Sequence, residues 1–333
     1  MGIAGAVIVL FGLREVSAIA GPVALALVLV IAVAPVRGRL AASRAPGWLQ
    51  VAVPFLIVVL VLLGMVAILI FSVTQLALLL PEYAGAFQRL AADGQRWAAQ
   101  YGLGDDVLGR TMRAFDPTRL LEVAQALLGS LIGILSGLFL IVIVLLAMCL
   151  DAPVTARILA AGAGNRPRLV TALAEFTHRT RRYLIVSTIF GFLTAFLDVV
   201  ALEMLDVPLP LLWGVLAFIT IYIPNIGFVI GLIPPAILAL LDGGVRSMML
   251  VIAAYIVINV VIQSFILPKF LGDAVGLSTT MTLISLMIWT FVLGPLGAIL
   301  AIPLSLLTRA VLIDSDPSAT WARALVSGRL PKG

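Results

Sequence analysis

Long apolar runs separated by short polar connections dominate the sequence. They extend over residues 16–36, 49–73, 120–150, 183–205 and 247–267. Each run reaches the ~20 residues that an α-helix needs to cross the hydrocarbon core of a bilayer. The pattern therefore predicts an all-α integral membrane protein that crosses a lipid bilayer several times.

Two further apolar stretches, residues 219–241 and 277–313, are interrupted by proline and glycine. Proline removes a backbone donor and disturbs the preceding helical turn. In hydrocarbon, every freed backbone group needs a partner from protein or from water in a cavity. Paired breaks indicate the central site of a transporter, although each stretch could be one bent span, a re-entrant pair, or a kinked helix that only packs. We expect hinge or backbone-shaping roles at Pro224, Gly227, Gly231, Pro234, Gly294, Pro295, Gly297 and Pro303.

Composition supports a membrane protein and excludes several kinds of site. Hydrophobic residues make up 62% of the chain and charged residues 11%, against about 25% charged residues in soluble domains. Cys149 and His178 are the only residues of their types, which excludes an intrachain disulfide and cysteine- or histidine-rich metal sites. The sequence contains no glycine-rich phosphate-binding loop. We expect no metal, no cofactor, no nucleic-acid partner and no enzymatic activity.

Arginines cluster in the connections and set the expected orientation. Arg37, Arg39 and Arg44 follow the first full-length run, and residues 151–182 are rich in arginine. The positive-inside rule places both groups at the cytoplasmic face, with both chain termini on that side. The predicted organisation is N-terminal transmembrane helices at 1–74, a helical extracytoplasmic insertion at 75–120, a transmembrane helix at 121–150, an Arg-rich cytoplasmic loop at 151–182, a transport core at 183–313 and a cytoplasmic tail at 314–333.

Four polar side chains in the apolar stretches are candidates for binding a substrate or an ion: Asp198, Asn225, Asn259 and Gln263. An ionisable group inside a span is costly and indicates function by default. Asp198 shares a helical face with Ser187 and Thr194, which predicts a polar stripe along a cavity. The alternatives are a hydrated Asp198 near the outer interface, and amides at 259 and 263 that only join helices by hydrogen bonds.

Four segments, at residues 181–192, 222–241, 266–277 and 293–304, resemble the signatures of the autoinducer-2 exporter family of bacterial permeases, in order and correctly spaced. The resemblance implies about eight transmembrane helices with bent or re-entrant segments. It also implies an oligomer such as a pentamer, and multi-pass transport at the bacterial inner membrane. The matching positions shape the backbone: Pro224, Gly227, Pro234, Pro268, Gly272, Gly276, Gly294, Gly297 and Pro303.

The chain departs from this family pattern at two places. Relatives often carry an acidic residue shortly before the position of Pro268, where this chain has Ile262, Gln263 and Ser264. Relatives often carry His-Pro after the position of Gly276, where this chain has Ser278 and Thr279. Because a carboxylate and an imidazole are both missing, proton-coupled transport borrowed from the family is less supported.

Three functions compete at this stage. The first is an inner-membrane secondary transporter that exports a small polar molecule such as autoinducer-2, a function that the family resemblance implies. The second is a sodium (or lithium)/proton antiporter in which Asp198 exchanges the monovalent cation. The third is a homo-oligomeric membrane scaffold without transport, suggested by a heptad-spaced stripe at residues 83–101 and by glycines four residues apart at 129–137.

Overall fold

The computed structural model describes residues 2–83, isolated positions from 85 to 96, residues 117–224, 226–266 and 277–317, and positions 319 and 326. Helices make up nearly all of this part, and no strand occurs in it. They are α1 (Gly2–Glu15), α2 (Ser17–Ala42), α3 (Gly47–Leu79), η1 (Leu80–Tyr83), α6 (Pro117–Gly162), α7 (Pro167–Met204), α8 (Pro210–Thr220), α9 (Gly227–Asn259), η2 (Val260–Ile266), α11 (Thr279–Leu293), α12 (Pro295–Ile299), α13 (Ala301–Arg309) and η3 (Ala310–Asp314).

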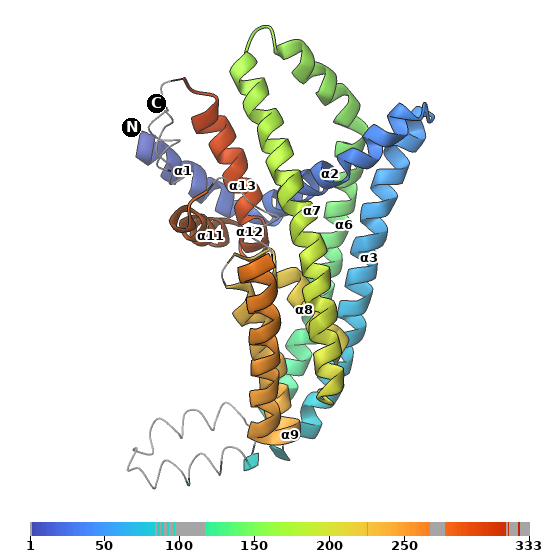
Figure 1. Ribbon diagram of the computed structural model, residues 1–333, viewed down its shortest axis with the longest axis vertical. Coiled ribbons are helices and arrows are strands. Elements are labelled where there is room, and N and C mark those ends of the chain that lie inside the picture. Colours follow the sequence, from blue (N-terminus) through green and yellow to red (C-terminus); the bar gives the residue numbers. More distant parts are fainter. Residues whose placement is uncertain are drawn as a thin grey trace.

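Among the described residues, five helical stretches are long and apolar enough to cross a membrane. They are Ser17–Ala42, Gly47–Tyr83, Gly133–Gly162, Pro167–Met204 and Gly227–Gln263. Figure 1 shows α3, α6, α7 and α9 running together along the long axis of the molecule. These findings confirm the prediction of an all-α integral membrane protein. Most of the predicted insertion at 75–120 and of the tail at 314–333 lies outside the described residues.

Residues 151–182, expected as an arginine-rich loop, are helical over most of their length. α6 continues to Gly162, and α7 already begins at Pro167. The only connection is a short turn between them, which stands at the upper end of the molecule in Figure 1. Alanine, leucine and arginine are good helix formers, and the breakers in this segment are concentrated at 162–167. The helices therefore continue beyond the apolar runs that predicted the spans.

The helix labelled α9 reverses direction at Gly244, whose backbone angles are φ 74° and ψ −169°. A straight helix would separate Gly231 from Asn259 by roughly 42 Å, yet both residues line one cavity. Two antiparallel helices therefore meet at this turn. The Tyr83 hydroxyl donates a hydrogen bond to Asp242 Oδ1 (3.1 Å), which attaches the end of α3 beside the turn.

α8 and the first half of α9 form a hairpin, and the described residues of its turn are 221–224 and 226. With 11 residues, α8 is roughly 16 Å long, too short to cross ~30 Å of hydrocarbon. Residues 219–241 are therefore not one bent span: they contain the end of α8, the turn and the first half of α9. The break lies around Pro224, while Pro234 and Pro235 lie inside continuous helix. The interruption of the helix that the sequence predicted at these two prolines does not occur.

α11, α12 and α13 form a second hairpin, which turns at Gly294 (φ 64°). It packs on the N-terminal half of α7, where Phe176 and Tyr183 share a core with Leu306. The first hairpin packs on the opposite half of α7, where Leu202 contacts the core of α8 and α9. Ile223, in the turn of the first hairpin, packs against Leu286, Ala298 and Ala301 of the second hairpin. α7 is thus the common support of both broken segments.

One glycine in each hairpin allows its two helices to approach closely. A Cβ at Gly227 would overlap the Thr220 carbonyl oxygen, and a Cβ at Gly297 would overlap the Trp289 carbonyl oxygen. In both cases the obstacle is backbone, which cannot rotate away as a side chain can. The second hairpin is closed further by a hydrogen bond from Trp289 Nε1 to Ser305 Oγ (3.1 Å). The predicted backbone-shaping role thus has a physical basis at these two glycines.

Replacing Gly227 with alanine should destabilise the protein, because the added methyl group displaces one helix of the first hairpin. Overpacking of this kind costs about 1–3 kcal/mol, so we expect the melting temperature in detergent to fall by several degrees. Gly64→Ala is the matched control, since a Cβ at Gly64 meets nothing within 4 Å. Equal melting temperatures for the two variants would contradict the close approach.

Candidate functional site

A small polar cavity lies between α7, α8 and the two halves of α9. Its volume of ≈ 10 Å³ corresponds to about one water molecule. α7 contributes the polar face that the sequence predicted, and the hairpin turn begins at its edge. The lining residues are Thr194, Asp198, Ala217, Thr220, Ile221, Phe228, Gly231, Tyr255, Asn259 and Gln263.

The Asp198 carboxyl group is completely buried, at 0% exposure. Neither of its oxygens has a hydrogen-bond partner within the described residues, and the same is true of Thr194 Oγ1 and Tyr255 Oη. Buried polar atoms are nearly always paired, and an isolated buried charge costs far more than an isolated neutral group. Three unsatisfied side chains around a space for one water indicate a binding site for a small polar particle.

The two predicted amides belong to the same site and are partly satisfied by their own helix. Asn259 Nδ2 donates to the Tyr255 carbonyl oxygen (2.9 Å), and Gln263 Nε2 donates to Asn259 Oδ1 (2.7 Å). Both of these bonds run along one continuous helical stretch, from Tyr255 to Gln263. The π-helical η2 begins directly after Asn259, and such turns are frequent at functional sites. The amides thus form one wall of the cavity.

The turn at 221–226 closes the cavity toward the arginine-rich end, and α7 holds it in place. The Tyr183 hydroxyl donates to the Tyr222 carbonyl oxygen (3.1 Å). The Thr188 hydroxyl donates to the Leu184 carbonyl oxygen (2.7 Å), so the Tyr222 hydroxyl is the donor in its 2.6 Å contact with Thr188. Moving the turn away from α7 would break both hydrogen bonds between Tyr222 and α7.

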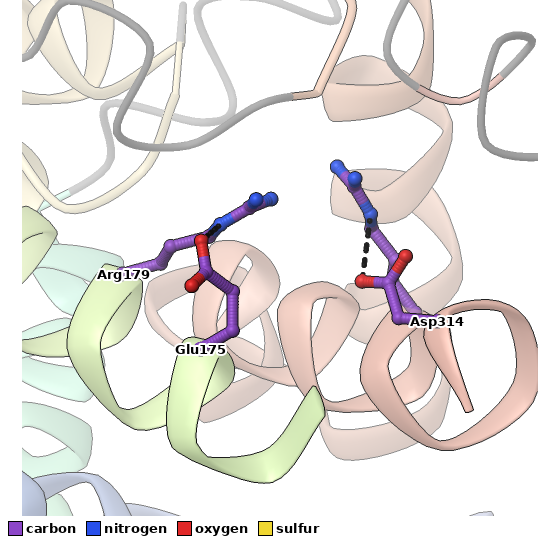
Figure 2. Close-up of polar contacts among 4 residues, drawn as sticks. Glu175, Arg179 and Asp314 are labelled. Atoms are coloured by element: carbon purple, nitrogen blue, oxygen red, sulfur yellow. Dashed lines mark hydrogen bonds and ion pairs between the residues drawn. The ribbon is translucent and has the colours of Figure 1, made fainter. Parts of the chain in front are cut away.

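Two ion pairs occur elsewhere among the described residues, whereas the Asp198 carboxylate has no hydrogen-bond partner there. Glu175 and Arg179 form an ion pair on successive turns of α7 (2.8 Å), and Arg309 contacts Asp314 at 3.2 Å. Figure 2 draws both contacts. An exposed pair such as Glu175–Arg179 contributes little to stability, whereas the Arg309 and Asp314 side chains are more buried, at 11% and 20% exposure. Of the side chains that the structure describes, Asp198 is the only fully buried carboxylate.

The structure brings together three of the four predicted binding residues: Asp198, Asn259 and Gln263. The fourth, Asn225, lies outside the described residues, as do Pro268, Gly272 and Gly276. Gly231 lines the cavity as well. The positions in the second hairpin, from Gly294 to Pro303, do not line it.

Sequence reasoning did not select Thr220, Tyr255 or Phe228 as site residues. Tyr255 lies one helical turn before Asn259 and Thr220 lies just before the break, so both could have been found from spacing. No sequence signal marked Phe228. In the part of the chain that the structure covers, no three His, Cys, Asp or Glu side chains lie close enough together to hold a metal ion. The polar groups that line the cavity are hydroxyl, carboxylate and amide groups.

Comparison with known proteins gives a consistent result. The sequence matches the AI-2E family transporters over residues 3–315, a range that includes the whole cavity. A protein of Haemophilus influenzae named only as a transport protein is 28% identical over 327 residues, covering 97% of this chain and 94% of that protein. The AI-2 transport protein TqsA of Escherichia coli K12 is 29% identical over 310 residues, covering 92% and 89%.

Replacing Asp198 with asparagine should leave the melting temperature in detergent equal to or above that of the wild type. The amide keeps the shape of the side chain and removes a buried carboxylate that has no partner among the described residues. An average substitution lowers stability by about 1 kcal/mol. Asp314→Asn, the same change at a carboxylate paired with Arg309, should lower the melting temperature. The reverse order of the two variants would contradict an unpartnered Asp198.

Proposed function

The chain belongs to the AI-2E transporter family, and we propose that it is a secondary transporter whose ion-exchange site is the Asp198 cavity. In this proposal a monovalent cation and a proton bind at Asp198 in turn. The observation that carries it is the fully buried carboxylate without a hydrogen-bond partner in the described residues. Burying an ionisable group at this depth costs free energy, so its presence indicates a function.

The size of the cavity favours an ion over a larger substrate. A volume of ≈ 10 Å³ holds about one water molecule, and therefore also a proton carrier or a small cation such as sodium or lithium. Thr194, Asp198 and Tyr255 supply oxygen atoms, which hard cations prefer. The site is built for a small ion in this conformation.

Access to the site is proposed to come from movement of the first hairpin. The hydrogen bonds of Tyr222 to α7 close the cavity toward the end that carries the arginines. By the positive-inside rule this end faces the cytoplasm, with the protein in the bacterial inner membrane. Opening then requires the turn at 221–226 to leave α7, while the close glycine contact keeps each hairpin intact.

Export of a small polar molecule such as autoinducer-2 is the second candidate. It is supported by the relative TqsA, whose name assigns it AI-2 transport, at 29% identity. A molecule of that size does not fit ≈ 10 Å³, so this function requires a more open conformation. Exchange of ions at Asp198 would then drive the export. A homo-oligomeric scaffold, the third candidate, predicts no flux of either kind.

Ion exchange can be measured in proteoliposomes with an internal pH-sensitive dye, by adding sodium, lithium or potassium outside. We expect a cation-dependent pH change with the wild type and a loss of at least tenfold with Asp198→Asn, because the amide cannot exchange a proton for a cation. Glu203→Gln is the matched control, since Glu203 is on the same helix and exposed. Equal flux in wild type and Asp198→Asn would exclude Asp198 as the exchange site.

Inverted vesicles separate the remaining candidates. Accumulation of labelled autoinducer-2 above that of empty vesicles, dependent on a cation or proton gradient, supports the exporter. Ion exchange without such accumulation supports an antiporter. The absence of both fluxes, with a correctly folded oligomer, would favour the scaffold and overturn the proposal.

A further inference from the structure

A second cavity lies between α2, α3 and α6, away from the Asp198 site. Its volume is ≈ 50 Å³. Its lining residues come from the C-terminal end of α2, the N-terminal end of α3 and the C-terminal half of α6. These ends carry Arg37, Arg39 and Arg44 and the exposed Trp48, a basic and aromatic composition typical of a membrane surface. The cavity therefore begins at the level of lipid headgroups.

The end of the cavity near this surface is polar. Arg37 lines it and has no hydrogen bond or ion pair within the described residues, so its guanidinium group is available to an anion. Gln50 lies beside it and donates one hydrogen bond through Nε2 to the Ala45 carbonyl oxygen (2.9 Å). An arginine binds phosphate through several parallel N–H groups. This end offers a site for a phosphate group.

The remainder of the cavity is apolar and extends along the helices toward the protein core. Val33 is one turn deeper than Arg37 on α2, and Val51 and Pro54 line the facing side of α3. The deep end is closed by the packed cluster that contains Cys149 and Leu145. The cavity is thus polar at the headgroup level and apolar below it, which is the polarity of one lipid molecule.

We propose that this cavity binds an anionic phospholipid, with the phosphate on Arg37 and the first few methylene groups of one acyl chain in the apolar part, whose ≈ 50 Å³ leaves the rest of the lipid outside in the bilayer. A free phosphate ion would leave the apolar part unfilled, and an uncharged lipid would leave Arg37 without an anion. Basic pockets between transmembrane helices at the cytoplasmic side are a known form of headgroup recognition. The lipid joins the three helices at a place remote from the ion site, so this inference does not depend on the proposed function.

Titration of the purified protein with phosphatidylglycerol and with phosphatidylcholine, followed by native mass spectrometry, tests the headgroup. We expect phosphatidylglycerol to bind more tightly to the wild type. Arg37→Gln should weaken phosphatidylglycerol binding by about fivefold, the effect of one arginine near a lipid surface. Arg39→Gln is the control, because Arg39 is exposed and does not line the cavity. Equal affinities of the two variants, or of the two lipids, would overturn the proposal.

Cys149 provides a second readout in the unmodified protein, since it is the only cysteine of the chain and lines the apolar part. Phosphatidylglycerol should slow its alkylation by N-ethylmaleimide several-fold, because the acyl chain covers the thiol. Inorganic phosphate should leave the rate unchanged. Equal protection by phosphate and lipid, or no protection by lipid, would rule out an acyl chain at this position.

Discussion

The structure depends on one constraint, the need to pair every backbone polar group that is withdrawn from water inside a membrane. The turn at 221–226 is where this constraint is most severe, because the helix is interrupted between two apolar helices. Local bonds satisfy part of it, such as Ile223 N–H to the Thr220 carbonyl (2.8 Å). Tyr183 supplies another bond from α7. The interrupted helix is stabilised by hydrogen bonds with the adjacent α7. The long helix and the broken segment therefore form one structural unit.

The same unit explains why the polar cavity is where it is. A hairpin turn in the middle of the protein leaves helix ends and hydroxyl groups at that depth, and α7 places Asp198 and Thr194 opposite them. The reversal at Gly244 then brings Tyr255 and Asn259 back to the same level. Residues that are far apart in sequence therefore meet only because two reversals return the chain to α7. Neither reversal alone would assemble the site.

Much of this arrangement could be predicted from the sequence, and the limits have physical causes. The apolar runs identify the spans because burial in lipid requires them, and Asp198, Asn259 and Gln263 were detectable as polar groups in apolar surroundings. Pairing of helices depends on tertiary contacts, so the juxtaposition of these residues was not detectable. The break expected at Pro234 does not occur, because a helix continues through proline when neighbouring elements support it. The extent of α6 and α7 was missed because helix propensity does not end where hydrophobicity ends.

The reversal at Gly244 divides a stretch that hydropathy counts as one crossing into two antiparallel helices. By length and composition, Gly227–Gln263 counts as a single crossing. Gly231 and Gln263, near its two ends, nevertheless line the same cavity. The hairpins also return to the end from which they start. The α2–α3 connection, the α6–α7 connection and η3 all lie at one end of the molecule (Figure 1). A topology map drawn from hydropathy alone, with five crossings, also places the residues after α9 at this end, but it leaves out the short helices Pro210–Thr220 and Thr279–Leu293 and therefore misses both hairpins.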